Sequence, residues 1–298
     1  EKHPDITVVS VRETNSPVDA IDFHSAKIDG AQLPELEIDP DSVACIFYTS
    51  GTTGRPKGAQ LTNRGCVTNV LNVVAMGRTY ATAAALSKAE SASDVDVQSP
   101  PAATSLIATP LFHVTANNCA VQAGTLAGSR FVLMYKWDTL DALKLIEAEG
   151  VNTISAVPMM TRELLNHPEF SDYDTSSLAS MGGGGAAMQP DLARKVDEQT
   201  KKARPAQGYG MTEVCGIITY IAGDVFLDRP ESCGYLAPTF EGRGREAARA
   251  GEGDGRNSSV GAPRLGLTSA VGKSTVWLPE TSLSMASPTC APSTSTVM

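Results

Sequence analysis

The chain has 298 residues, with 24 lysines and arginines against 33 aspartates and glutamates, and 42% of its residues are hydrophobic. This composition is that of a globular protein and excludes fibrous, largely disordered and membrane-embedded classes, since no apolar stretch reaches the ~18 residues of a membrane-spanning helix. The net charge of −9 argues against a nucleic-acid surface, whereas small anionic ligands stay compatible because a few local donors can bind them.

The six cysteines are widely spaced and form no C-x-x-C pair. This spacing indicates neither a zinc site nor a dense disulfide framework, so we expect mostly small buried side chains in a reducing compartment. The chain starts at Glu1 without a signal peptide, and Thr296-Val297-Met298 is not the peroxisomal S-K-L sequence. We therefore expect a cytoplasmic protein, and the missing initiator methionine leads us to expect a piece of a longer gene product.

Short β-branched runs alternate with amphipathic stretches from about residue 43 to residue 222. The first apolar run, Val43–Thr49, has the length of a strand, and a helix is expected over Thr62–Met76 with Thr62 as its N-cap. The further elements expected are strands over Ser105–Thr109, Arg130–Met134, Val151–Val157 and Leu178–Met181, and helices over Asn117–Leu126, Asp138–Glu149, Met159–Asn166 and Pro190–Lys202. Strands separated by helices of this length predict an α/β fold with a mostly parallel sheet flanked by helices.

Two stretches break this alternation. Residues 79–103 are rich in Ala and Ser and end in Ser99-Pro100-Pro101, which is typical of an exposed, partly helical insertion. In residues 241–298, 27 of the 58 positions are Gly, Ser, Thr or Pro, with Trp277 as the one aromatic residue. Such a low-complexity segment is not expected to bury enough apolar surface to fold alone.

The most informative segment is Y-T-S-G-T-T-G-R-P-K-G, residues 48–58, which we expect between a strand and a helix. Glycines let the backbone N–H groups approach a ligand, hydroxyls add donors, and Lys57 supplies a mobile positive charge. Seven Gly, Ser or Thr residues around one lysine favour a polyphosphate site over a plain polar turn.

A Walker A pattern does not fit here. The near match at Gly266 and Gly272-Lys273-Ser274 has one residue too many and is interpreted as accidental.

At this loop the sequence resembles the adenylate-forming superfamily, which includes acyl-CoA synthetases, firefly luciferase and the adenylation domains of peptide synthetases. Further similar segments follow in the family's order: P-L-F-H-V at Pro110–Val114, G-G-G-A-A-M at residues 183–188 and Q-G-Y-G-M-T-E at residues 207–213. Lys136-Trp137-Asp138 and His167-Pro168-Glu169-Phe170 are similar to the fatty-acyl and aryl-CoA ligase branch. The similarity covers roughly residues 35 to 240.

The resemblance implies that a carboxylate is joined to AMP with loss of pyrophosphate and then passed to the thiol of CoA, with Mg²⁺ assisting. The implied ligands of the β- and γ-phosphates are Thr49, Ser50, Gly51, Thr52, Thr53, Gly54 and Lys57. The implied adenosine and α-phosphate site comprises Gly185, Ala186, Ala187, Gln207, Gly208, Tyr209, Gly210, Met211 and Thr212. Tyr209 would stack on the adenine, Thr212 would bond the α-phosphate, Glu213 would hold Mg²⁺ and His113 would line the acyl pocket. The implied catalytic residues are Lys57, His113, Thr212 and Glu213.

Each of these residues also has an ordinary structural interpretation. A Thr-Glu pair outside this motif is usually a helix start, because Thr caps a helix and Glu favours its first turn. Outside the same motif, Tyr209 would be a half-buried core aromatic, and His113 beside apolar residues could be structural. The order of the motifs favours the functional interpretation.

The resemblance stops at Glu241, since no T-G-D motif, hinge or small C-terminal domain with a catalytic lysine follows in this sequence. We therefore expect residues 1–240 to be the central part of an AMP-binding domain whose small C-terminal domain is absent, and residues 241–298 to be a disordered or aberrant tail. The expected function is ATP-dependent activation of a carboxylic acid for CoA, with a fatty acid as the expected substrate and an aryl acid as the other candidate, and with activity weak or absent in this chain. An adenylation domain that loads a carrier protein and a non-catalytic nucleotide-binding remnant are the alternatives. The sequence does not indicate the oligomeric state.

Overall fold

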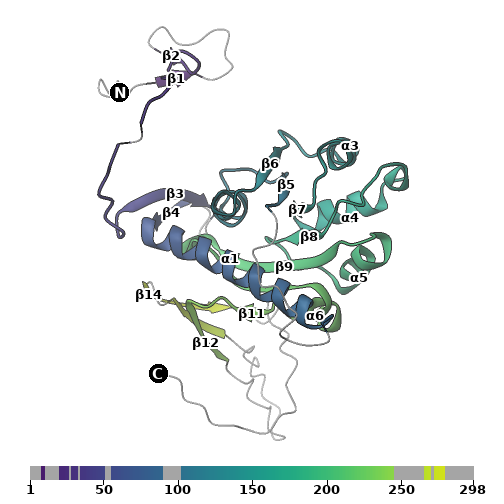
Figure 1. Ribbon diagram of the computed structural model, residues 1–298. Helices are drawn as coiled ribbons and strands as arrows, with labels where there is room; N and C mark the ends of the chain where they lie inside the picture. Colours follow the sequence, from purple (N-terminus) through teal and green to yellow (C-terminus); the bar gives the residue numbers. More distant parts are fainter. Residues whose placement is uncertain are drawn as a thin grey trace, which may run out of the picture. The chain divides into compact units, whose positions relative to one another are not determined.

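A computed structural model describes residues 8–10, 20–26, 28–32, 34–50, 55–89, 102–244, 265–269 and 272–278 (Figure 1). The chain divides into two units, Glu1–Ile38 and Asp39–Met298. In the first unit, β1 (Val8–Ser10) and β2 (Ala20–Asp22) form a short parallel pair. All of the segments with candidate functional residues belong to the second unit.

A seven-stranded sheet organises the second unit, with the strand order β11-β10-β9-β8-β7-β5-β6. Its strands are β5 (Thr104–Ile107), β6 (Arg130–Leu133), β7 (Thr153–Ser155), β8 (Ser180–Gly183), β9 (Arg204–Met211), β10 (Gly216–Ala222) and β11 (Tyr235–Leu236). The five strands from β6 to β9 are parallel, whereas β10 and β11 are antiparallel to their neighbours. This confirms the predicted α/β class with a mostly parallel sheet.

Helices follow most of the parallel strands. They are α1 (Asn63–Leu86), the π-helix η2 (Thr115–Gln122), α2 (Ala123–Leu126), α3 (Thr139–Glu149), α4 (Pro158–Asn166), the 3₁₀ turn η3 (Phe170–Asp172), α5 (Pro190–Gln199), the 3₁₀ turn η4 (Thr212–Val214) and α6 (Gly223–Asp228). Helices α3, α4, α5 and α6 contact one another in sequence, and their buried faces share one core with β7 and β8. In this core Leu143, Ile146 and Phe226 are completely buried, so these helices pack against the sheet through one common core.

Local signals explain where several helices begin and end. Thr62 caps α1 by accepting the amide hydrogen of Gly65 at 3.1 Å, as predicted. Gly150 ends α3 in the left-handed conformation with φ 59°, which a glycine adopts without a steric penalty. Helix α1 continues ten residues beyond the predicted end at Met76, because Ala81–Leu86 is rich in strong helix formers.

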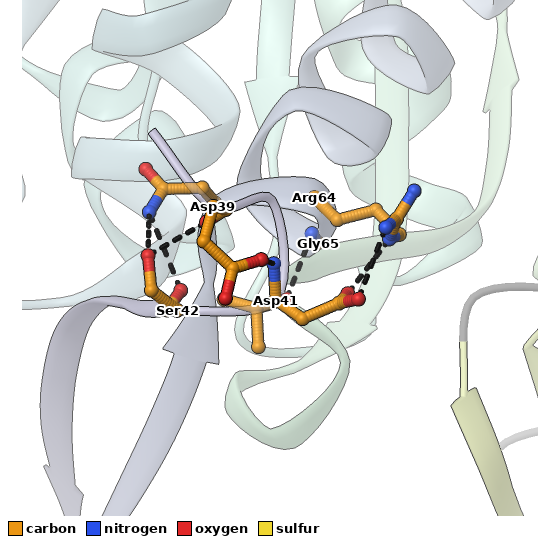
Figure 2. A network of polar contacts seen from close by, with 7 residues as sticks. Asp39, Asp41, Ser42, Arg64 and Gly65 are labelled. Carbon is orange, nitrogen blue, oxygen red and sulfur yellow. Dashed lines mark hydrogen bonds and ion pairs between the residues drawn. The ribbon is translucent and has the colours of Figure 1, made fainter. Parts of the chain in front are cut away.

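The strand before the 48–58 segment does not lead directly into a helix, which corrects the sequence prediction. Strand β3 (Val43–Thr49) pairs antiparallel with β4 (Lys57–Thr62), so the segment is the loop of a hairpin. Polar bonds then tie the start of α1 to the entry of β3 (Figure 2). The Arg64 guanidinium donates to both carboxylate oxygens of Asp41, at 2.8 and 3.0 Å, and Asn63 donates to the Ser42 hydroxyl at 3.1 Å.

The segment after residue 240 contains strands where disorder was expected. Strands β12 (Phe240–Gly244), β13 (Leu265–Ser269) and β14 (Gly272–Leu278) pair in antiparallel order. Composition alone overlooked the apolar alternation within L-G-L-T-S and S-T-V-W-L. Gly272-Lys273-Ser274 starts a strand rather than a loop before a helix, so the context of a phosphate loop is lacking. The predicted division of the chain at residue 241 stays a prediction.

Among the described residues, no helix is long and apolar enough to cross a membrane.

Candidate functional site

The carboxyl ends of β5, β7, β8 and β9 lie at one edge of the main sheet, because these strands are parallel. Three of the segments singled out in the sequence leave the strands at this edge. Residues 108–114 follow β5, residues 184–188 follow β8, and Thr212 and Glu213 follow β9. The carboxyl edge of a parallel sheet is the usual place for ligands in α/β proteins.

The glycine turn after β8 comes very close to its neighbouring strands. A Cβ atom at Gly183 would lie 2.1 Å from the carbonyl oxygen of Ala156, and a Cβ atom at Gly184 would lie 2.9 Å from that of Gly208. Only glycine therefore fits at Gly183 without a backbone shift. The following residues Gly185, Ala186 and Ala187 are exposed, so their backbone groups are open to a ligand.

Gln207 holds this turn in place. Gly183 and Gln207 are register partners on β8 and β9, and the side-chain oxygen of Gln207 accepts a hydrogen bond from the backbone amide of Met188. Met188 itself is buried in the main core. Gln207 therefore fixes both ends of the turn, and its side-chain oxygen is engaged with the protein rather than free for a ligand.

Tyr209 and Gly210 continue along β9 toward the edge. The half-buried ring of Tyr209 packs with Ile218 and Met211, and this burial raises the pKa of its hydroxyl. A Cβ atom at Gly210 would lie 2.0 Å from the carbonyl oxygen of Gly216, so β9 and β10 approach this closely only because residue 210 has no side chain. The ring of Tyr209 is thus partly packed against the protein and partly accessible, which is compatible with stacking on a planar ligand.

The turn η4 carries Thr212 and Glu213 immediately after β9. Cys215 ends the turn in the left-handed conformation with φ 67°, and its amide donates to the carbonyl oxygen of Thr212 at 3.0 Å. Glu213 is exposed, and its carboxylate has no hydrogen bond or ion pair to the described residues. The described part of the chain contains no group of three or more His, Cys, Asp or Glu side chains that could enclose a metal ion. A single open carboxylate fits Mg²⁺, because Mg²⁺ takes most of its ligands from phosphate and water.

One buried cluster contains residues that lie within or directly beside three predicted motifs. Its members are Phe47, Leu61, Cys66, Val114 and Cys215. Phe47 directly precedes the phosphate segment, Val114 ends the P-L-F-H-V segment, and Cys215 follows η4. Strand β4 also packs against η4. The hairpin that carries the phosphate segment is therefore anchored in the same core as the turn with Thr212 and Glu213.

The predicted phosphate ligands are only partly described. Thr49 and Lys57 are register partners at the end of the hairpin that carries the loop, where Ser50 and Lys57 are exposed. Gly51, Thr52, Thr53 and Gly54 lie outside the described residues. The described ends of the loop present an ammonium and hydroxyl groups to solvent, which is compatible with binding phosphate.

His113 has a structural hydrogen bond. Its ring nitrogen Nδ1 accepts the amide hydrogen of Thr115 at 3.1 Å and so supports the start of η2. His113 is nevertheless exposed, and so is the ring of its neighbour Phe112, which has 81% of its surface accessible. The residue can therefore orient η2 with one nitrogen and meet a ligand with the other.

A separate surface cavity of about 490 Å³ lies along α4, where it is lined by Arg162, Glu163 and His167 among others. Its charged groups are already paired, since Arg162 forms an ion pair with Asp191 and Glu163 accepts from the Trp137 indole at 2.7 Å. The strand edge is therefore the stronger candidate for the functional site than this cavity. The sequence did not single out Asn69 and Asn118, which lie buried beside η4, because an isolated asparagine carries no local signal.

Comparisons with known proteins identify the family of this chain. Residues 1–243 match the family described as AMP-binding enzyme. The chain is 32% identical over 221 residues to 4-coumarate-CoA ligase 1 from Narcissus pseudonarcissus, covering 72% of this chain and 37% of that protein. It is 30% identical over 248 residues to the 4-coumarate–CoA ligase of Vanilla planifolia, covering 79% of this chain and 41% of that protein. The chain thus spans less than half the length of these curated relatives.

Solved structures show the same architecture. The N-terminal domain of FACL13 from Mycobacterium tuberculosis superposes with a TM-score of 0.59 and 26% identity, covering 80% of this chain and 52% of that domain. O-succinylbenzoate coenzyme A synthetase (MenE) from Bacillus subtilis, in complex with ATP and magnesium ion, superposes with a TM-score of 0.57 and 25% identity, covering 82% of this chain and 46% of that protein. Both comparisons place this chain within a larger fold.

Proposed function

Because the chain belongs to the AMP-binding enzyme family, we propose that it binds ATP at the carboxyl edge of its main sheet and activates a carboxylic acid for transfer to CoA. The observation that carries this proposal is the shared buried cluster of Phe47, Val114 and Cys215, which anchors the phosphate, acid and α-phosphate segments in one core. The cluster holds these three segments, which are distant in sequence, close to one another in space.

In the proposed complex, adenine lies between the exposed backbone of Gly185–Ala187 and the ring of Tyr209. Thr212 donates its hydroxyl hydrogen to the α-phosphate. Thr49, Ser50 and Lys57, together with Gly51, Thr52, Thr53 and Gly54, hold the β- and γ-phosphates. Mg²⁺, held in part by Glu213, would neutralise charge on the phosphate oxygens.

The proposed reaction has two steps. A carboxylate oxygen attacks the α-phosphorus, the bond from this phosphorus to the bridging β-oxygen breaks, and pyrophosphate leaves with acyl-AMP formed. Lys57 can follow the leaving phosphates and stabilise their growing charge. In the second step the thiolate sulfur of CoA, its proton lost to solvent, attacks the acyl carbon, the bond from this carbon to the phosphate oxygen breaks, and AMP leaves. The 298 residues contain no T-G-D motif, so we expect this polypeptide alone to bind nucleotide and to turn over slowly.

For the acid we propose an aryl carboxylic acid. The curated relatives at 30–32% identity are named for 4-coumarate, and none of their names refers to a fatty acid. The acid would enter at residues 110–114, where Leu111, Phe112 and His113 are exposed at the strand edge. Aromatic and imidazole side chains there would suit a planar ring better than a flexible alkyl chain.

Acid-dependent exchange of labelled pyrophosphate into ATP tests the activation step. The acids would be 4-coumarate, malonate, o-succinylbenzoate and a fatty acid, with the chain alone and with the chain fused to the C-terminal region of a curated relative. We expect weak exchange from the chain alone and strong exchange from the fusion with 4-coumarate. No exchange by a well-folded fusion with any acid would contradict the proposal, and a preference for the fatty acid would overturn the aryl assignment.

A further inference from the structure

Two completely enclosed asparagines flank the turn that carries Thr212 and Glu213. Asn69 on α1 has 2% of its surface exposed, and Asn118 on the π-helix η2 has none. Buried amides are costly unless they are hydrogen-bonded, so the partners of these two side chains show what they stabilise.

Their partners are the backbone groups on both sides of Gly216. The side-chain oxygen of Asn69 accepts the amide hydrogen of Ile217 at 2.8 Å, and the side-chain nitrogen of Asn118 donates to the carbonyl oxygen of Cys215 at 3.0 Å. The two asparagines also join each other, since the Asn69 side chain donates to the carbonyl oxygen of Asn118 at 3.0 Å. Side chains from two helices thus hold the exit of η4.

The backbone at this exit needs such support. Cys215 has φ 67° and Gly216 has φ 143°, so two successive residues adopt conformations that L-amino acids rarely adopt. A Cβ atom at Gly216 would lie 2.4 Å from the side-chain oxygen of Asn69, so even alanine would collide there. Strained backbone of this kind persists only where its surroundings fix it, and it is concentrated at functional sites.

The same network extends to the acid segment. Gln122 donates to the side-chain oxygens of Asn117 and Asn118, at 2.9 and 3.4 Å, and Asn117 donates to the carbonyl oxygen of Leu111 at 3.2 Å. All three of these side chains come from η2. A π-helix in this position is itself typical of functional sites, because its extra residue redirects side chains that an α-helix would place elsewhere.

We propose that Asn69 and Asn118 are positioning residues that fix the η4 turn, so that Thr212 and Glu213 point at the α-phosphate and at Mg²⁺. They touch neither ligand, and they act through the backbone of Cys215 and Ile217. The identity of the ligands, ATP and Mg²⁺, rests on the proposed function. The role of the two asparagines in fixing the turn rests on the geometry alone.

The test compares Asn69→Ala with Asn72→Ala. Asn72 lies three residues further along α1 and is equally buried at 2%, but its side chain donates to the Thr239 hydroxyl at 2.7 Å and not to the turn. Both variants lose one buried amide, so both are expected to lower the melting temperature. The first readout is ATP affinity with and without Mg²⁺. Asn69→Ala should weaken the Mg²⁺-dependent binding of ATP about 10-fold, which is the scale for groups that orient a metal ligand without contacting the metal. Asn72→Ala should keep this affinity.

The second readout needs no nucleotide. Cys215 and Cys233 are both nearly buried, at 7% and 9% exposure, so their rates of maleimide labelling can be compared within one protein by mass spectrometry. Asn69→Ala should raise the labelling of Cys215 severalfold over that of Cys233, and Asn72→Ala should not. Equal ratios in the two variants would overturn the positioning role. Absence of Mg²⁺-dependent ATP binding in the unsubstituted chain would instead contradict the proposed function, while the labelling ratio would still decide the role of Asn69.

Discussion

Gly182 and Ala206 are register partners on the parallel strands β8 and β9, and a Cβ atom at Gly182 would lie 2.0 Å from the carbonyl oxygen of Ala206. The two strands can therefore approach only because residue 182 has no side chain. Since the glycine turn with Gly185 leaves β8 just beyond this contact, the same absence of a side chain sets the position of the proposed adenine site.

Gly182→Ala should lower the free energy of unfolding by at least 1–3 kcal/mol, the cost of forcing extra atoms into a packed interior. Gly77→Ala is the matched control. Gly77 lies in the middle of α1, exposed and with no atom within 4 Å of an added Cβ, so alanine should raise the free energy of unfolding by about 1 kcal/mol. Urea titrations of both variants would measure the difference. Equal stability of the two would contradict the packing of β8 against β9.

Gln207→Ala should weaken AMP binding by releasing the turn that Gln207 holds through the Met188 amide. A lost hydrogen bond of this kind costs about 1 kcal/mol, which corresponds to a several-fold increase in the dissociation constant. Gln189→Ala is the control, because the exposed Gln189 precedes α5 without a side-chain capping bond. AMP titrations of the two variants should differ. An unchanged affinity in Gln207→Ala would show that the turn does not bind adenine.

Lys57→Met should affect ATP far more than AMP. If Lys57 holds the β- and γ-phosphates, its removal should weaken ATP binding by about 10-fold or more, as expected for a charge-assisted hydrogen bond, and leave AMP affinity within error. Arg55→Met, which removes a neighbouring exposed cation, separates this specific contact from general electrostatic attraction. A parallel loss for ATP and AMP would place Lys57 elsewhere in the site.

The stability of the protein should fall on the alkaline side of pH 9. Burial, together with the Cys66 thiol at 3.9 Å, raises the pKa of Cys45 from 9.0 to about 11. The unfolded chain therefore loses this proton first, so the folded state is fully favoured below pH 9 and loses this contribution as the pH rises to about 11. Urea titrations at intervals from pH 8 to pH 11 should show a shallower decline for Cys45→Ala. An identical decline would mean that partial burial beside Cys66 does not raise the pKa of the Cys45 thiol.

Local sequence signals predicted the elements that depend on local causes. Thr62, Gly150 and Pro190 mark helix ends, and the alternation of apolar runs with amphipathic stretches predicts the parallel sheet. The pairing of β4 with β3 was missed, because the K-G-A-Q-L-T strand is weakly apolar and is stabilised by a partner across the loop. Strand β10 was missed although G-I-I-T-Y-I-A is apolar and rich in β-branched residues, and it turns back antiparallel on β9 at the left-handed residue Cys215.

The candidate site was likewise predicted only in part. Tyr209, Thr212 and Glu213 were singled out through the order of motifs, and the structure places their segment at the same sheet edge as the predicted acid segment and the glycine turn. Asn69 and Asn118 gave no signal, because their importance comes from backbone partners that lie 148 and 97 residues away in the sequence. Residues expected to contact a ligand lie in recognisable sequence motifs, whereas residues that position other residues can be identified only from the folded structure.

Isothermal titration of the 298-residue chain with ATP and Mg²⁺, alongside the Tyr209→Ala variant, measures whether the strand edge binds nucleotide. We expect saturable binding at one site, weakened in the variant by the loss of aromatic stacking, worth ~1–3 kcal/mol or about 10-fold for a nucleobase. Circular dichroism of both proteins would verify that they are folded. Absence of binding by the folded chain, or equal affinity in the variant, would contradict a nucleotide site built on β8, β9 and η4.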